Sequence, residues 1–205
     1  MVAAEQEFME RGFTAAKMTA IAKRAGVTHA MLHYYYRNKE NLFDQVFQQK
    51  MSLMAQSFLT VVDQEISPQE RIRKAIEFHF DFLADNPRLP LFILREIVDN
   101  PERRVSCQKV LMPVFQKVIR SMMTLLNREA ERGTIAKVDA FDFIMSFVSL
   151  NIFTVLSLPV VSMLVDIKEG KTEAFLRLRK EQIVQQALDR LRCRAPEDNH
   201  QPIIS

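Results

Sequence analysis

The chain has 205 residues, 48% of them hydrophobic, and a net charge of +3, so it can build a sizeable core in one large or two smaller domains. With only four glycines, it contains no G-x-G-x-x-G or Walker-type loop, which excludes the nucleotide-binding classes defined by such loops. The two cysteines, Cys107 and Cys193, form no metal-ligand spacing, and the opening MVAAEQEFMERGF has no basic or apolar signal region. We therefore expect a cytoplasmic protein without a structural zinc site.

The charge is unevenly distributed along the chain. Between residues 11 and 39 there is no acid, and the six cations are Arg11, Lys17, Lys23, Arg24, Arg37 and Lys39. The remainder of the chain therefore carries a net charge of about −3, which is the total of +3 less the +6 of this segment. A basic first segment on a mildly acidic body is typical of a nucleic-acid-binding module attached to another domain. Charge alone leaves a solvated basic face as an equal alternative.

The first part of the chain predicts short helices over 2–11, 18–25 and 29–35, and then a long helix over 39–65. Gly12 and Gly26 end the first two helices, and we expect Gly26 at a left-handed position where a Cβ would be penalised. Thr28 and Asn38 are the predicted N-caps of the third and fourth helices. Two short helices joined by a tight turn that contains glycine form a helix-turn-helix.

Longer helices follow. Ser67, Pro68 and Glu70 carry the signals of a capping box, which begins a helix that runs to residue 85. The remaining predicted helices cover 89–98, 103–132 with a kink or interruption near Pro113, 139–165 and 172–192. The tail, 194–205, has no periodicity, and we expect it to be disordered. The predicted fold class is therefore all-α.

The third predicted helix has one face to bury and one to expose. Leu32 and Tyr36, four residues apart, can pack on the second helix, which assigns Tyr36 to the core. The opposite face combines small, apolar and hydrogen-bonding side chains, a mixture that suits the major groove of DNA. The predicted contacts to bases or phosphates are Thr28, His29, Ala30, Met31, His33, Tyr34 and Tyr35, with Lys39 as a phosphate contact in the next helix.

The stretch GFTAAKMTAIAKRAGVTHAMLHYYYRNKENLF, residues 12–43, resembles the DNA-binding domain of the tetracycline-repressor (TetR/AcrR) family of bacterial regulators. The matching positions are Gly12, Phe13, Ile21, Ala22, Ala25, Gly26, Val27, Thr28, Leu32, Tyr35, Tyr36, Lys39, Glu40, Leu42 and Phe43. The resemblance implies a helix-turn-helix DNA-binding domain over 1–45 and a larger helical effector-binding and dimerisation domain over 46–193. It further implies a homodimeric repressor that binds a palindromic double-stranded DNA operator and is released by a small hydrophobic or amphipathic effector.

The chain departs from the family pattern where the second helix begins. The family usually has a Ser or Thr cap at the position of Lys17. Thr19 can instead cap a shortened helix, or Lys17 can meet a phosphate, and we include both among the predicted DNA-binding residues. The order His33-Tyr34 also reverses the common Tyr-His order of the family.

Residues 143–165 carry no charge, and by length they could span a membrane. Asn151 and Pro159 within the segment, and the acids Asp142 and Asp166 at its ends, favour a helix buried in a protein instead. In the family, the last two helices pair across a two-fold axis as a four-helix bundle. We therefore predict a homodimer through 139–165 and 172–192 without membrane insertion, and a membrane-anchored helical protein is the alternative.

Phenylalanine and methionine are concentrated in the middle of the chain, where they can form a core or line an adaptable apolar cavity. For any single residue the core is the better assignment, whereas as a group they fit the effector cavity that the resemblance implies. The predicted ligand-binding residues are Phe78, His79, Phe82, Phe92, Arg95, Phe115, Met122, Phe147 and Asn151. His79 is the main candidate for a polar contact, with a purely structural hydrogen bond as the alternative.

No pattern of an enzyme is present: the sequence has no nucleophile–base arrangement, paired-carboxylate motif or H-E-x-x-H. Glu77, His79 and Asp81 alternate, but on a helix such positions diverge by about 200°, so they do not predict a metal site. We predict a DNA-binding regulator rather than an enzyme, with no metal or cofactor. A ligand carrier built on a regulator scaffold remains a third possibility.

Overall fold

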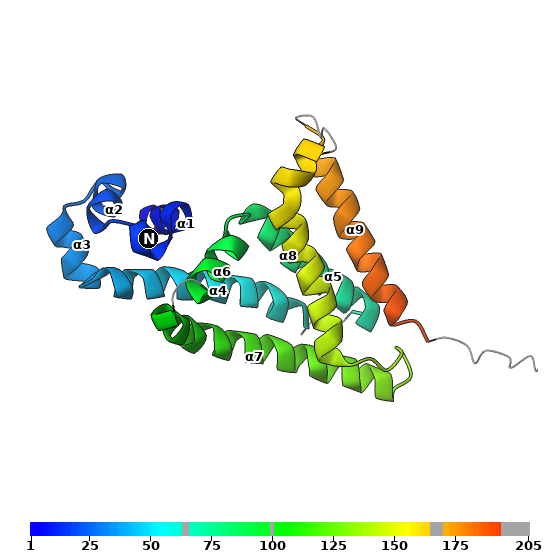
Figure 1. The fold of residues 1–205 in the computed structure, drawn as a ribbon. Helices are drawn as coiled ribbons and strands as arrows, with labels where there is room; N and C mark the ends of the chain where they lie inside the picture. Colours follow the sequence, from blue (N-terminus) through cyan, green and yellow to red (C-terminus); the bar gives the residue numbers. More distant parts are fainter. Residues whose placement is uncertain (63–65, 99–100, 165–169, 194–205) are drawn as a thin grey trace, which may run out of the picture.

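The computed structural model describes residues 1–62, 66–98, 101–164 and 170–193, and every regular element in these ranges is an α-helix (Figure 1). The helices are α1 (Val2–Ala15), α2 (Met18–Ala25), α3 (His29–Tyr36), α4 (Lys39–Val62), α5 (Pro68–Asp85), α6 (Leu89–Val98), α7 (Pro101–Glu131), α8 (Ala140–Leu164) and α9 (Thr172–Arg190). α1 to α3 form a compact unit at one end of α4, and the longer helices pack around its other half (Figure 1). The predicted all-α fold is confirmed.

Local sequence signals set most of the helix ends. Three helix starts are capped as predicted by Thr28, Asn38 and Ser67. Their side-chain oxygens accept hydrogen bonds from backbone N–H groups at 3.2, 2.8 and 3.2 Å. Gly26 ends α2 with a φ of 68°, the left-handed conformation expected of it. α2 begins after Lys17 without a side-chain cap, so the capping role considered for Thr19 is wrong.

Two helices differ from the prediction. The helix breaks at Gly12 as predicted, with a φ of 69°, but one more turn follows to Ala15 and is counted in α1. α7 continues through Pro113 without interruption, and it begins at Pro101, where a missing N–H is tolerated in the first turn. The predicted helical residues 63–65 and 165, and the tail 194–205, lie outside the described residues.

The buried side chains form two clusters. In the first, Phe43 and Phe47 of α4 pack against Phe92 of α6, with ring centroids 5.4 and 6.0 Å apart, beneath the helix-turn-helix unit. The second cluster joins α5, α7, α8 and α9 around Phe80 and Phe143. The predicted boundary at residues 45/46 therefore falls inside α4, within a core to which α6 also contributes.

Candidate functional site

α3 presents its predicted polar and aromatic face to solvent. Leu32 is 6% exposed and Tyr36 is half-buried, both packed in the first core cluster. On the other side Met31, Tyr34 and Tyr35 are 46%, 82% and 68% exposed. His29, Ala30 and His33 are also exposed, so six predicted DNA contacts share one accessible surface. An eight-residue helix packed on one side leaves such a face open to a groove of DNA.

His33 has a defined hydrogen-bonding role on this face. Its Nδ1 lies 2.7 Å from the carbonyl oxygen of Arg37, and because a carbonyl only accepts, Nδ1 must carry the proton. In the neutral ring Nε2 is then an acceptor. The ring also makes an edge contact with His29, with centroids 4.4 Å apart. His33 can thus accept a hydrogen bond from the amino group of an adenine or a cytosine.

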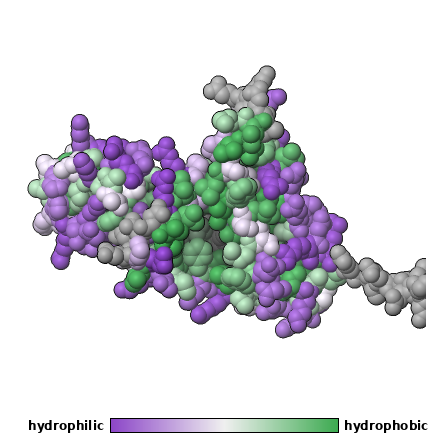
Figure 2. All heavy atoms as spheres, in the orientation of Figure 1, coloured by the Kyte–Doolittle hydropathy of each residue, from purple (hydrophilic) through white to green (hydrophobic). Residues whose placement is uncertain are grey.

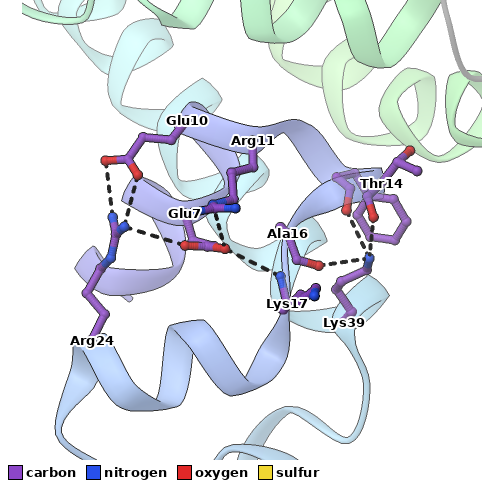
Figure 3. A network of polar contacts seen from close by, with 9 residues as sticks. Glu7, Glu10, Arg11, Thr14, Ala16, Lys17, Arg24 and Lys39 are labelled. Atoms are coloured by element: carbon purple, nitrogen blue, oxygen red, sulfur yellow. Dashed lines mark hydrogen bonds and ion pairs between the residues drawn. The ribbon is translucent and has the colours of Figure 1, made fainter.

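Half of the six N-terminal cations are engaged within the protein (Figure 3). Arg24 donates to both carboxylate oxygens of Glu10 at 3.2 and 2.9 Å, and this hydrogen bonding lowers the pKa of the Glu10 carboxyl. Arg11 lies 3.3 Å from the buried carboxylate of Glu7, to which Arg24 also extends at 3.5 Å. The Arg24 contacts fasten α2 to α1, whereas the Arg11–Glu7 pair lies within α1.

Lys39 is the third engaged cation, and its predicted role needs correction. Its Nζ donates to the carbonyl oxygens of Phe13, Thr14 and Ala16 at 2.9, 3.3 and 3.1 Å (Figure 3). An ammonium has three N–H donors, and these three carbonyls satisfy all of them. Lys39 therefore holds the end of α1 against α4, which leaves no donor for the predicted phosphate contact.

The remaining cations, Lys17, Lys23 and Arg37, are exposed and form no ion pair within the described ranges. Arg37 follows α3 directly and, with a φ of 64°, is the one non-glycine residue described with a positive φ. Lys17 was predicted as a DNA contact, whereas Lys23 and Arg37 were not. The sequence could have singled out Lys23 and Arg37, because the acids at positions 7 and 10 are available to pair with Arg11 and Arg24, whereas the segment from 11 to 39 has no acid to pair with the other cations.

The predicted ligand-binding residues do not form one site. A small cavity of about 80 Å³ lies among α4, α5, α7 and α8, and its lining is Met54, Ala55, His79, Val114, Phe115, Val118, Ile119, Phe141, Ile144, Met145 and Val148. Of the predicted set only His79 and Phe115 line it. The other lining residues are aliphatic or aromatic, so His79 supplies the polar group of the cavity.

His79 is held by a second predicted residue. Asn151 Nδ2 lies 3.0 Å from His79 Nδ1 and donates to the Ile76 carbonyl at 3.2 Å, while the His79 ring contacts Phe147 edge-on. Burial lowers the pKa of His79 to about 4, because the charged imidazolium loses its hydration. The histidine is therefore neutral near pH 7, and the cavity carries no charge.

The other predicted ligand residues lie elsewhere. Met122 belongs to the second core cluster and Phe82 packs on the first, whereas Phe78 is 43% exposed. Phe92 and Arg95 face a separate cavity of about 330 Å³ between α1 and α6. Helical periodicity could not separate these places, because residues that share one helix face can contact different neighbours along the helix.

α8 has a second apolar face that the single chain leaves uncovered. Phe153, Val160 and Met163 are 70%, 57% and 82% exposed, and Leu178 of α9 is 57% exposed. Figure 2 shows hydrophobic residues gathered along α8, whereas the helix-turn-helix end is mostly hydrophilic on the same face. Among the described residues α8 is the one helix long and apolar enough to cross a membrane, with 22% of its most apolar stretch buried.

Comparison with known proteins gives matches along most of the chain. Residues 1–46 match the family described as bacterial regulatory proteins, tetR family, and residues 68–186 match the tetracyclin repressor-like C-terminal domain. The fatty acid metabolism regulator protein of Bacillus subtilis is 26% identical over 110 residues, which are 53% of this chain and 57% of the relative. The transcriptional activator FasR of Mycolicibacterium smegmatis is 29% identical over 103 residues, 50% of this chain and 47% of FasR.

The matches thus span about half the length of these curated relatives. Among solved structures, the regulator FadR of Bacillus subtilis in complex with stearoyl-CoA has a TM-score of 0.67 at 17% identity. The similarity covers 93% of this chain and 97% of that one. At this identity the likeness concerns the fold.

Proposed function

The chain belongs to the tetR family of bacterial regulatory proteins, and from this premise we propose that it is a dimeric transcriptional repressor released by a ligand with a long apolar chain. The observation that carries the proposal is the exposed face of α3. It combines Met31, His33 and Tyr34 with Arg37 at its end, and Lys17, before α2, is a second exposed cation; neither forms an ion pair with the described residues. Base-reading side chains flanked by phosphate-binding cations are what operator recognition requires.

Dimerisation is supported by the uncovered face of α8. Phe153 and Val160 are far more exposed than the α8 residues that pack on α5, and Leu178 of α9 is exposed as well. A second copy of the chain would bury this surface and place two α3 helices for successive major grooves, about 34–36 Å apart. A dimer through α8 and α9 agrees with a palindromic operator.

The proposed effector carries an acyl chain. The cavity is lined by apolar side chains and one neutral histidine, and two relatives act in fatty acid regulation or were solved with stearoyl-CoA. Its volume of about 80 Å³ is far below the roughly 300–1,000 Å³ of ligand pockets, so binding must widen it. Met54, Met145 and Phe115 can move to do so, because methionine adapts to irregular shapes and Phe115 is partly exposed.

An electrophoretic mobility shift experiment tests the proposal. The full chain should retard DNA from upstream of its own gene, with salt-dependent affinity, and stearoyl-CoA should reverse the shift. Ala55→Leu adds three carbons to the cavity wall and should weaken this reversal without weakening the shift. Ala130→Leu, which adds the same atoms to α7 away from the cavity, is the matched control. A chain that shows no salt-dependent DNA binding refutes the proposal.

The one other function that an observation favours is a membrane anchor, since α8 is long and apolar enough to span a bilayer. In the fold, however, α8 buries Phe143, Phe147 and Asn151 against other helices, with Asn151 bonded to α5. Insertion of α8 alone would open that core. Fractionation separates the two functions, because an anchored chain would pellet with membranes and be released only by detergent.

A further inference from the structure

The break in α1 at Gly12 is repaired by a side chain from a distant helix. A break leaves the next N–H without its intrahelical acceptor. The N–H of Phe13 donates instead to Glu96 Oε1 at 2.9 Å, across 83 residues of sequence. Glu96 lies on α6 and is 2% exposed. Its carboxylate therefore serves as the N-terminal cap of the turn from Phe13 to Ala15, supplied from outside the helix-turn-helix unit.

The same turn is held at its other end by Lys39. The Nζ of Lys39 binds the carbonyls at residues 13, 14 and 16 and lies 4.5 Å from the centroid of the Phe13 ring. An anion at the start of a helical turn and a cation at its end both agree with the helix dipole. Lys39 is the first residue of α4, three positions after α3 ends. The turn thus connects Glu96 of α6 to Lys39, just after the end of α3, the recognition helix.

α6 is placed to transmit movement to this turn. It contacts α7 and α8, which line the apolar cavity, and it also contacts α1. A shift of α7 and α8 around a bound ligand would therefore displace α6 and the Glu96 carboxylate. The competing route is α4, which runs from the cavity at Met54 to Lys39 without a break. The route through α6 needs Glu96, whereas the route through α4 does not.

We propose that Glu96 is the residue that couples effector binding to the position of the recognition helix, through its bond to the Phe13 N–H. The inference rests on the proposed function, because it describes how a regulator of this kind would respond. Glu96 is a positioning residue: it acts on DNA through the turn at residues 13–16 and through Lys39. Loss of this bond should uncouple the helix-turn-helix unit from the cavity, so that DNA and effector both still bind but no longer affect each other.

The test compares operator affinity with and without stearoyl-CoA for the full-length wild type, Glu96→Ala, Glu96→Gln and Glu129→Ala. Glu129 is a matched control: it is 3% exposed and accepts from Thr134 at the far end of α7, away from α1. Coupling in such proteins is typically about 5–150-fold. We expect Glu96→Ala to lower the wild-type ratio to within about twofold of one, with the dimer and effector binding retained. Glu96→Gln keeps an acceptor oxygen and should restore most of the ratio, and Glu129→Ala should leave it unchanged.

A measurement on the unmodified protein keeps the inference testable if the alanine variant does not fold. Hydrogen exchange at the amides of residues 13–16 should become faster when stearoyl-CoA is added, because the Phe13 N–H loses its acceptor. If stearoyl-CoA releases the wild type from DNA but leaves this exchange unchanged, the inference is overturned, and so it is by a wild-type affinity ratio in a folded Glu96→Ala protein. A wild type that ignores stearoyl-CoA refutes the proposed effector instead, so the two failures are distinguishable.

Discussion

The buried histidine of the cavity makes the stability of the fold depend on pH in a defined direction. His79 has its pKa lowered from 6.5 to about 4, because burial removes the hydration of the charged ring. Above pH 6.5 the ring is neutral in both folded and unfolded chains. Between pH 6.5 and about pH 4 only the unfolded chain takes up the proton, so acid favours unfolding.

The magnitude follows from the difference between the two pKa values. A difference of about 2.5 pH units, at about 1.4 kcal/mol each, is worth about 3.5 kcal/mol in full, and about 3 kcal/mol of it is lost by about pH 4. His79→Gln keeps a hydrogen-bonding side chain beside Asn151 but does not titrate. We therefore expect the wild type to lose about 3 kcal/mol more than the variant as the pH falls through this window.

Urea denaturation at a fixed protein concentration, over a series of pH values, measures the effect as the difference between the two proteins. Carboxylates that protonate in the same range contribute equally to both and cancel in that difference. If the stability of wild type and His79→Gln falls in parallel from neutral to acid pH, the reasoning from burial is refuted. Such a result would mean that water reaches the ring of His79 in solution.

Four further variants test the DNA-binding domain and the dimer. Arg37→Ala should weaken binding to all DNA sequences and lower the salt slope by about one, which a salt titration of DNA binding measures. Lys39→Ala should instead lower the free energy of unfolding by about 1–2 kcal/mol, which urea denaturation measures. Tyr34→Ala should lower discrimination between operator variants by about 1–3 kcal/mol in competition assays, and a loss that is uniform across sequences would contradict base contact. Phe153→Asp should give a monomer in light scattering, and a persistent dimer would show that α8 is not its interface.

Much of the fold could be predicted from the sequence because its signals are local. The caps at Thr28, Asn38 and Ser67 and the left-handed Gly26 depend on residues within one turn, so short patterns identify them. The exposed face of α3 could also be predicted, since a helix of this length can bury only one side. Gly12 breaks α1 for the same local reason, but the further turn to Ala15 could not be predicted, because Glu96, far along the chain, caps the residue after the break.

The ligand-binding set was the weakest prediction, for a physical reason. Phe92 and Phe115 have the same chemistry, yet one fills the core under the helix-turn-helix unit and the other lines the cavity. Which neighbour a phenylalanine meets is decided by how helices cross, and composition and spacing do not encode that crossing. Lys39 shows the same limit for charge, because its partners are backbone carbonyls, which every sequence contains.

The neutral interior of the cavity would divide recognition of the proposed effector into two parts. Next to His79, whose imidazole is uncharged near pH 7, a buried carboxylate or phosphate would find no cation to offset its lost hydration. The interior can therefore select only the length and shape of an apolar chain. A charged headgroup must remain where Phe115, Phe141 and Met145, the partly exposed lining residues, meet solvent. Chain length should then set affinity, at about 0.8 kcal/mol for each buried methylene, until the widened cavity is full. Calorimetry with acyl-CoAs of increasing length measures this dependence, and an affinity indifferent to chain length would place the acyl chain outside the cavity.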